Sequence, residues 1–472
     1  MLNSMFDFKI KPKVKSVNLG EEQIEALNKL EEFVSSKEDC ICLSGSSGSG
    51  KTTLCKEFID YLDDEQINYV VAAPTHRAKL VLEALTGCTD TYTVHQLLAL
   101  SPNIEIFELD YRELIFEIDR AKGKYNSAIP YNGVVIVDEA SMINDDLFDL
   151  LVEKCKKSKS KVVMIGDEHQ LRPVKSDHLS KAFSLPNIIR LTKVYRQKKD
   201  SPVLNLLTEL REHSIPHFET IKGEEDSLLV YNNPTQFILA AEPYLKELVE
   251  TGNVLNCKLL AYTNERVRGF NKAARKLIFK EDCKNEFNKG EILVGKDNFN
   301  YDDYQFYNSL DYVVKCEPIK TTLRIPNFGE YLNGFILNLY DTVYKDSHDI
   351  FVLSKNNNID RLSRLASFIE EVRIRAIELK QQRRRSADLW KIYYETIGSF
   401  ATTFDLFYNN RVIKKKTFEY GYASTIHCVQ GMTLNTVFVD MANINTVWNK
   451  EELQQLQYVA ISRTRGNAYL LV

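Results

Sequence analysis

The sequence predicts an α/β protein built on parallel β-sheets. Short apolar runs recur between helical patterns, at 69–73, 134–137, 162–165, 258–262 and 437–440. Continuous apolar strands of this length, separated by helices, are typical of parallel sheets that are covered on both faces. Polar signatures follow several of these runs, at the carboxyl ends of strands where open α/β sheets bind their ligands. We therefore expect the functional site along those edges.

Length and composition indicate a globular chain of several domains. The 472 residues correspond to about three domains of ordinary size. No apolar run approaches the roughly 18 residues that a membrane span requires, and the N-terminus lacks the layout of a secretory signal. Nine cysteines are scattered without a C-x-x-C pair, which predicts a reducing cytoplasm and neither a disulfide framework nor a zinc module.

The charge balance excludes a protein that coats nucleic acid through bulk positive charge, because the formal net charge is −4. A narrow basic channel remains compatible with this value, since local clusters decide binding. Two basic clusters stand out, one at Arg411 with Lys414–Lys416 and one over 373–385. A solvated face explains each cluster more readily than a binding stripe.

The most informative motif is the stretch Gly-Ser-Ser-Gly-Ser-Gly-Lys-Thr at 45–52, which fits G-x-x-x-x-G-K-[ST]. An apolar run precedes it at 40–43 and a helical pattern follows at 53–62. In that context glycines turn backbone N–H groups around phosphates, and the helix N-terminus adds a favourable dipole. Lys51 reaches the β- and γ-phosphates, and Thr52 can ligate Mg²⁺. The predicted nucleoside triphosphate site comprises Gly45, Ser46, Ser47, Gly48, Ser49, Gly50, Lys51, Thr52 and Thr53.

Two further strand ends carry catalytic chemistry. Asp138 and Glu139 follow the apolar run 134–137, which predicts that Asp138 holds Mg²⁺ together with Thr52. Glu139 is predicted to orient and deprotonate the attacking water. The next apolar run leads into Gly166-Asp167-Glu-His-Gln170, where Gln170 is predicted to sense the γ-phosphate.

The order of these motifs resembles that of superfamily 1 helicases. Four later segments strengthen the resemblance: Leu191–Gln197, Ala261–Asn264, Ser424–Thr433 and Tyr458–Arg465. From about Leu19 to the C-terminus the chain is similar to the Dda-like helicases of the RecD-like 5′→3′ branch.

The resemblance implies further residues around ATP. Gln23 matches the glutamine that reads adenine, and Arg196 and Arg463 match two arginines that the second lobe presents to the γ-phosphate. A guanidinium suits this role because it is permanently charged. Arg465 is a near neighbour of Arg463, and the register favours Arg463. The implied catalytic set is Lys51, Glu139, Gln170, Arg196 and Arg463.

The resemblance also implies contacts with single-stranded DNA from both lobes. They are Pro74, Thr75, His76, Lys79, Thr93 and His95 in the first lobe, and Thr263, Asn264, Thr425, His427 and Gln430 in the second. Threonine and backbone N–H groups suit phosphate oxygens, while histidine can stack on a base. Helix capping is the alternative role for Thr75 and Thr93.

The domain organisation implied by the resemblance is two RecA-like lobes, each with an insertion. Lobe 1 is expected at 1–95 and 126–188, with a strand-separating hairpin at 96–125. Lobe 2 is expected at 189–295 and 416–472. Its insertion at 296–415 is expected to be β-rich and SH3-like, with strands at 310–315 and 340–344 and a tower formed by one long helix over 361–394. Phe107, Tyr111 and Phe116 compete as the tip of the hairpin.

The predicted function is that of an ATP-dependent DNA helicase that moves 5′→3′ and uses ATP and Mg²⁺. The implied partners are single-stranded DNA and its junctions with duplex, with single-strand-binding or replication proteins as candidates. We expect a monomer without membrane contact, in the cytoplasm of the host cell if a phage encodes it, and a role in DNA replication or recombination. An RNA-directed superfamily 1 helicase and a nucleotide-switched binding protein that does not translocate are the alternatives.

Overall fold

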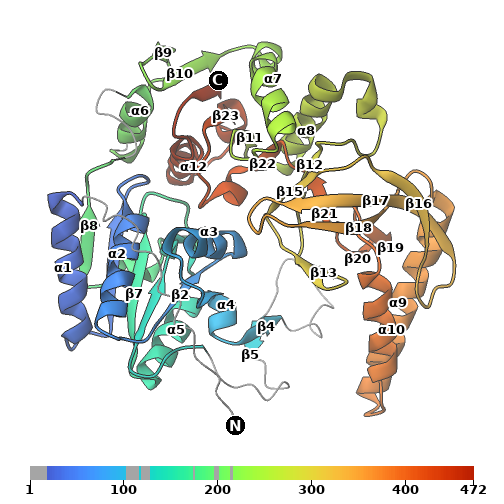
Figure 1. Cartoon of the computed structure of the whole chain (residues 1–472), viewed down its shortest axis with the longest axis horizontal. Coiled ribbons are helices and arrows are strands. Elements are labelled where there is room, and N and C mark those ends of the chain that lie inside the picture. The colour runs from blue at the N-terminus through green and yellow to red at the C-terminus, as the bar shows by residue number, and fades with distance from the viewer. Residues whose placement is uncertain (1–18, 103–115, 119–127, 174–175, 196–200, 213–215) are drawn as a thin grey trace, which may run out of the picture.

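The computed structural model describes residues 19–102, 116–118, 128–173, 176–195, 201–212 and 216–472 (Figure 1). Two α/β lobes lie one above the other in this view, and a β-rich module with two long helices lies beside them. Among the described helices, none combines the length and apolar character needed to cross a membrane.

Lobe 1 is a six-stranded parallel sheet in the order β3-β2-β6-β7-β1-β8. The strands are β1 (Cys40–Gly45), β2 (Tyr69–Ala73), β3 (Thr91–Thr93), β6 (Val134–Val137), β7 (Lys161–Gly166) and β8 (Ile188–Leu191). Helices α1 (Glu21–Ser35), α2 (Lys51–Asp64) and α3 (His76–Thr86) pack on one face. Helices α4 (Val94–Leu97) and α5 (Asp145–Lys157) pack on the other face. The predicted parallel sheet with two covered faces is confirmed.

Lobe 2 repeats this architecture with the strand order β22-β11-β23-β24-β10-β9, in which β9 is antiparallel to β10. The strands are β9 (Ile221–Lys222), β10 (Ser227–Tyr231), β11 (Cys257–Ala261), β22 (Ala423–Thr425), β23 (Thr436–Asp440) and β24 (Ala468–Leu471). Helices α6 (Pro202–Arg211), α11 (Met441–Ile444) and α12 (Lys450–Ser462) cover one face, and α7 (Pro234–Thr251) and α8 (Asn264–Phe279) cover the other.

The β-rich module is an antiparallel sheet in the order β16-β17-β15-β12-β21, with β18 paired to β17. Its strands are β12 (Ile292–Gly295), β15 (Asp311–Val314), β16 (Ile319–Arg324), β17 (Tyr331–Asp341), β18 (Ser347–Leu353) and β21 (Phe418–Tyr420). Short pairs are formed by β13 (Phe299–Tyr301) with β14 (Tyr304–Phe306) and by β19 (Leu406–Tyr408) with β20 (Arg411–Lys414). The strand expected at 340–344 ends earlier, at Asp341, because the Asp341 carboxylate accepts the N–H groups of Val343 and Tyr344 and turns the chain.

Three predicted boundaries move. β8 pairs with β1, so the sheet of lobe 1 extends past residue 188 to Leu191. β12 and β21 pair with each other inside the module sheet, so the module includes residues that were expected in lobe 2. In each case an apolar segment pairs with a strand of the adjacent domain and completes its sheet. The order of segments along the chain does not reveal this pairing.

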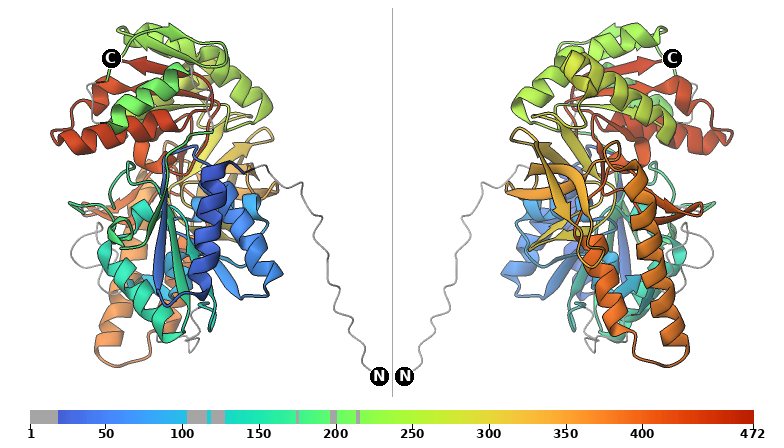
Figure 2. Two further views of the ribbon diagram at one scale, coloured as in Figure 1. Left: turned by 90° about the vertical axis from the view of Figure 1, so that its left-hand side faces the viewer. Right: turned by 90° about the vertical axis from the view of Figure 1, so that its right-hand side faces the viewer.

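The prediction of one long helix over 361–394 is wrong. The tower consists of two helices, α9 (Ile359–Gln381) and α10 (Ala387–Gly398), that run side by side in opposite directions (Figure 2). The chain reverses after Gln381, where Arg383 adopts a left-handed φ of 54°. Folding back lets apolar residues of α9, such as Leu365 and Ile369, share a core with Ile397 of α10.

The lobe 1 insertion is only partly described. β4 (Leu100–Pro102) and β5 (Phe116–Ile118) form an antiparallel pair, as a hairpin requires. Phe107 and Tyr111 lie outside the described residues, and so the tip of the hairpin stays a prediction.

A buried ionic cluster joins the three parts of the molecule. Asp311 on β15 accepts hydrogen bonds from Arg77 of α3 at 2.9 Å and from Lys258 of β11 at 2.7 Å. Burial opposes the charge of the Asp311 carboxylate, but Lys258 and Arg77 outweigh it and lower its pKa. The side chain of Asp311 is wholly buried, and those of Lys258 and Arg77 nearly so. One carboxylate therefore ties lobe 1 and lobe 2 to the module.

We expect Asp311→Ala to lower the free energy of unfolding by about 3–5 kcal/mol, because it leaves two buried cations without their counterion. Urea denaturation followed by circular dichroism measures this loss. Glu153→Ala is the control, since Glu153 forms an exposed pair with Lys157 and its removal should change little. Equal unfolding midpoints for the two variants would contradict the proposed importance of the cluster.

Candidate nucleotide cleft and nucleic-acid face

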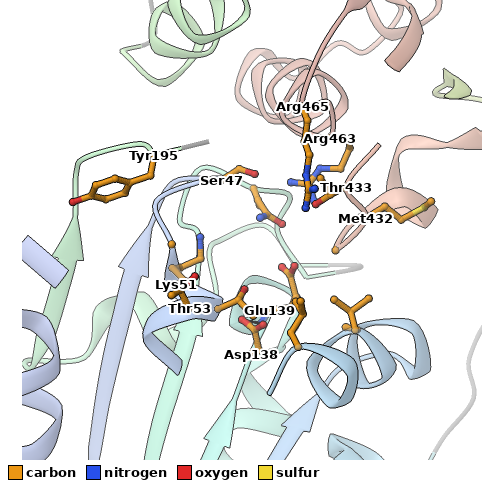
Figure 3. Close-up of a pocket in the computed structure, with 18 of the residues that line it drawn as sticks. Ser47, Lys51, Thr53, Asp138, Glu139, Tyr195, Met432, Thr433, Arg463 and Arg465 are labelled. Atoms are coloured by element: carbon orange, nitrogen blue, oxygen red, sulfur yellow. Dashed lines mark hydrogen bonds between the residues drawn. The ribbon is translucent and has the colours of Figure 1, made fainter. Parts of the chain in front are cut away.

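A cleft of about 620 Å³ lies between the two lobes (Figure 3). This volume is that of an ordinary small-molecule site. Lobe 1 contributes Ser47, Gly48, Gly50, Lys51, Thr52, Thr53, Lys56, Asp138, Glu139 and Gln170 to its lining. Lobe 2 contributes Gly431, Met432, Thr433, Arg463 and Arg465. Most of the residues predicted around the triphosphate therefore meet in one place.

The loop between β1 and α2 has the geometry of a phosphate-binding loop. Gly48 and Gly50 have φ of 85° and 84°, a left-handed conformation that glycine adopts without strain. Gly50 immediately precedes the first residue of α2, so backbone N–H groups and the helix N-terminus face the cleft together. The Lys51 ammonium folds over the loop and donates to the carbonyl oxygens of Gly45 at 2.6 Å and Ser46 at 3.0 Å. Gly45, Ser46 and Ser49 shape the loop without lining the cleft.

Gln23 braces this loop. Its Nε2 donates to the carbonyl oxygen of Ser49 at 3.2 Å, and its Oε1 accepts the N–H of Gly20 at 3.0 Å. The side chain is buried and is not among the residues that line the cleft. Its role as the reader of adenine stays a prediction.

The two carboxylates at the end of β6 differ in environment. Burial raises the pKa of Asp138 to about 7, the charge of Glu139 adds to the rise, and the hydrogen bond from the Glu139 N–H opposes it. Glu139 has a φ of 53°, a left-handed conformation that costs energy for a residue with a side chain. Backbone of lobe 2 comes close to it, since a Cβ built on Gly431 would lie 3.5 Å from Glu139 Oε1.

The donor set fits Mg²⁺ bound together with a nucleotide. Thr52 and Asp138 offer hard oxygen ligands at the floor of the cleft. Within the described residues there is no group of three or more histidine, cysteine, aspartate or glutamate side chains that could enclose a metal by itself. Mg²⁺ usually binds through one or two protein ligands with phosphate oxygens and water completing its shell.

Gln170 lines the same cleft, and its Oε1 is buried without a hydrogen-bond partner in the described part of the chain. Buried polar atoms are rarely left unpaired, and an exception inside a cleft marks a position for water or a ligand. The placement suits a residue that responds to the terminal phosphate.

The arginines of lobe 2 face the cleft from above (Figure 3). Arg463 follows α12, is buried, and donates to the Val459 carbonyl at 3.1 Å and to Ser462 Oγ at 2.9 Å. Arg465 also lines the cleft, but it is exposed. The choice of Arg463 over Arg465 stays a prediction, and Arg196 lies outside the described residues.

Three of the four threonines predicted to contact DNA cap helices, whereas the Thr425 side chain caps none of the described helices. Thr75 accepts the N–H of Ala78 at the start of α3, and Thr93 accepts the N–H of Gln96 at the start of α4, each at 3.2 Å. Thr263 caps α8 in the same way. The capping alternative is therefore realised at Thr75 and Thr93, and any DNA contact there would add to it.

Burial favours the neutral form of the three histidines that were predicted to contact DNA. Burial, reinforced by Lys79 and His95, lowers the pKa of His76 to about 4. Burial also lowers the pKa of His95 and that of His427. The His76 ring lies 4.8 Å from the Tyr307 ring of the module, measured between centroids. Neutral rings beside aromatic side chains suit stacking better than ionic contact with phosphate.

A second, narrow pocket brings two of the predicted DNA contacts of lobe 2 next to lobe 1. Asn264 and Thr425 of lobe 2 line it together with Arg77 of α3. Pro74 and Lys79 flank the same segment of lobe 1, and Gln430 carries a buried Nε2 without a hydrogen-bond partner among the described residues. Gly431, the next residue, lines the nucleotide cleft. The segment 425–433 thus connects the two sites.

Sequence reasoning missed three residues that touch the phosphate-binding loop. Arg211 of α6 donates to Ser46 Oγ at 2.6 Å, the N–H of Tyr195 donates to the Gly48 carbonyl at 2.8 Å, and the Tyr458 hydroxyl accepts the N–H of Ser47. Arg211 belongs to none of the motifs. Tyr458 is the first residue of the segment Tyr458–Arg465, which was recognised in the sequence, but no role was predicted for it.

Two parallel-sheet lobes that close on one phosphate-binding loop define a P-loop NTPase of the two-lobed, RecA-like type. A family model described as an AAA domain matches residues 18–227. The chain is 25% identical to the ATP-dependent DNA helicase dda of Enterobacteria phage T4 over 96% of this chain and 99% of that protein. It is also 31% identical to the ATP-dependent RecD2 DNA helicase of Deinococcus radiodurans, over 41% of this chain and 24% of that one.

The fold agrees with these matches. The crystal structure of the Pif1 helicase from Candida albicans superposes with a TM-score of 0.53 at 16% identity, covering 96% of this chain and 94% of that one. The chain is therefore similar in sequence, over nearly its whole length, to a Dda helicase, and similar in fold to a Pif1 helicase.

We expect Glu139→Gln to keep nucleotide binding and to lower ATP turnover by about 10²–10⁴-fold, because it removes the proton acceptor and leaves Asp138 in place. Steady-state hydrolysis and equilibrium binding of a fluorescent ATP analogue measure the two effects. Glu153→Gln is the exposed control. Hydrolysis by Glu139→Gln near the wild-type rate would show that another group accepts the proton.

Arg463→Ala should lower kcat by about 10³-fold or more with a modest change in nucleotide affinity, as expected of an arginine that stabilises the transition state. Arg465→Ala is the matched variant, since it removes the same group from the same side of the cleft. A larger loss of kcat in Arg465→Ala would reverse the assignment.

Proposed function

We propose that this protein is an ATP-dependent DNA helicase that translocates 5′→3′ along single-stranded DNA and unwinds duplex. The observation that carries the proposal is the segment 425–433 of lobe 2. Thr425 lines the narrow pocket beside α3, and Gly431, Met432 and Thr433 line the nucleotide cleft. A short rigid segment shared by both sites can transmit a change at the nucleotide to the strand.

In the proposed reaction, water attacks the γ-phosphorus and Glu139 accepts the proton of that water. The bond between the γ-phosphorus and the β–γ bridging oxygen breaks, and ADP leaves. Lys51 and Arg463 neutralise the charge that develops on the transferred group, and Gln170 orients the water and the terminal phosphate. Thr52 and Asp138 would hold Mg²⁺, which supplies further charge neutralisation at the phosphates when it is bound.

Translocation then requires that the two lobes bind the strand unequally in the nucleotide states, because a ligand shifts only an equilibrium whose states it binds differently. Closure over ATP brings Arg463 toward Lys51. Release of the phosphate removes the group to which both side chains are bound, and the lobes can open again. We assign the grip of lobe 1 to the segment around Pro74, Thr75 and His76, and that of lobe 2 to Asn264, Thr425 and His427.

We propose the domain division 19–95 and 128–191 for lobe 1, 201–291 and 421–472 for lobe 2, and 292–420 for the β-rich module with its tower. Single-stranded DNA and its junctions with duplex are the proposed partners, and a monomer working in the cytoplasm is sufficient for the mechanism. Contacts with single-strand-binding or replication proteins remain open to test.

Polarity is the most direct test of this function. A duplex with a 5′ single-stranded tail should be unwound, and the same duplex with a 3′ tail should be left largely intact. Strand separation is followed by fluorescence dequenching, with an RNA-tailed duplex as a third substrate. Preference for the 3′ tail would overturn the direction, and preference for RNA would favour the RNA-directed alternative. ATP hydrolysis without any unwinding or movement along the strand would favour a nucleotide-switched binding protein.

A further inference from the structure

The hydroxyl group of Tyr458 lies where three motifs of the two lobes meet. Tyr458 belongs to α12 of lobe 2, a helix that lies above lobe 1 in Figure 1, and the residue is only 2% exposed. The hydroxyl donates to Asp167 Oδ2 at 2.9 Å and accepts the backbone N–H of Ser47 at 3.0 Å. One side chain of lobe 2 thus bonds simultaneously to the phosphate-binding loop and to the segment after β7.

The direction of these hydrogen bonds is fixed by the state of the phenol. Burial, together with the charge of Asp167, raises the pKa of Tyr458 well above its ordinary value, so the hydroxyl keeps its proton. The backbone N–H of Ser47 can only donate, and an ionised carboxylate can only accept. Phenylalanine would fill the same space but would leave both of these groups without their tyrosine partner.

Asp167 in turn shapes the turn that carries Gln170. Its Oδ1 accepts the N–H of His169 at 3.0 Å, and its carbonyl oxygen accepts the N–H of Gln170 at 3.2 Å. The carboxylate is completely buried. A hydrogen bond to Asp167 can therefore affect the position of Gln170, which lines the cleft and whose buried Oε1 has no hydrogen-bond partner among the described residues.

The phosphate-binding loop receives two further contacts from lobe 2 beside Tyr458. Ser47 Oγ donates to the carbonyl oxygen of Ser462 at 3.3 Å, and Arg211 donates to Ser46 Oγ at 2.6 Å. Tyr458 differs from these because it alone of the three bonds also to the segment of Gln170. Among these three side chains, Tyr458 alone links lobe 2 both to the phosphate-binding loop and to the turn that carries Gln170.

We propose that Tyr458 is a positioning residue for ATP hydrolysis, whose hydroxyl sets the phosphate-binding loop through Ser47 and Gln170 through Asp167 when the lobes close. This role rests on the proposed ATP-driven motor. Opening of the lobes withdraws the hydroxyl from both loops at once, and closure restores it. The residue touches no reacting atom and acts only through its two partners.

The test compares Tyr458→Phe with Tyr469→Phe. Tyr469 is a matched control, because its hydroxyl also pairs inside lobe 2, with Tyr244 at 2.9 Å, but it does not reach lobe 1. At saturating single-stranded DNA we expect Tyr458→Phe to lower kcat for ATP about tenfold or more, as loss of a hydrogen bond to a charged group allows. The KM for ATP and the melting temperature should stay close to those of Tyr469→Phe.

A second variant tests the route through Asp167. Asp167→Asn keeps an oxygen that can accept the N–H of His169, but it places an N–H donor opposite the Tyr458 hydroxyl. That hydroxyl already accepts a hydrogen bond from the Ser47 N–H and loses the acceptor for its own proton. We expect Asp167→Asn to lower kcat to a similar extent, and the double variant to be no slower than the slower single variant. Additive losses would show that the two residues act independently and would overturn the proposal.

The remaining outcomes are equally decisive. A wild-type protein without ATPase activity stimulated by single-stranded DNA would refute the proposed function itself. An active wild type with Tyr458→Phe within about twofold of Tyr469→Phe in kcat would refute the positioning role alone. A parallel loss of kcat, nucleotide affinity and melting temperature in Tyr458→Phe would identify a packing role instead.

Discussion

Hydrolysis at this site depends on a geometric constraint, that groups from two separate sheets must meet within a few ångströms of one phosphate. The loop 45–52 belongs to lobe 1, whereas Arg463 and the segment 431–433 belong to lobe 2. A guanidinium group is permanently charged, so only its position decides whether it stabilises the charge on the phosphate. The contacts of Tyr458 and Arg211 with the loop hold the two lobes in register in the closed arrangement. In the proposed motor, hydrolysis therefore depends on the relative position of the two lobes.

A second constraint is the buried ionic cluster around Asp311. The Asp311 carboxylate binds Arg77 of α3 and Lys258 of β11, so the β-rich module is bonded to both lobes. α3 begins at His76, the last residue of the segment 74–76 that we assign to the DNA strand. The module is thus placed to stiffen the strand-binding end of lobe 1 while the lobes move at the nucleotide end. Loss of the carboxylate alone would leave two buried cations unpaired, and so this arrangement is costly to break.

Strands and motifs that depend on chain order and local pattern could be predicted from the sequence. The buried strands at 69–73 and 134–137 were predicted with their observed bounds, and the phosphate-binding loop was predicted from its flanking strand and helix. Pairing across distant segments was not accessible in the same way. The return of the tower at Gln382–Ser386, the addition of β8 to lobe 1 and the bonding of β12 to β21 depend on which surfaces meet. Arg211 and Asp311 belong to no motif, and their partners lie far away in the chain, so their contacts could not be predicted.

The central claim is that ATP closes the two lobes on each other. It can be measured with a donor and an acceptor fluorophore at Lys37 and Glu250, which are exposed residues of lobe 1 and lobe 2. Incorporation of unnatural amino acids avoids labelling of the nine native cysteines. With single-stranded DNA bound, a non-hydrolysable ATP analogue should change the transfer efficiency from its value without nucleotide. Exchange of the analogue for ADP should restore the value measured without nucleotide. An efficiency that is the same with the analogue, with ADP and without nucleotide would contradict a motor driven by closure of the cleft.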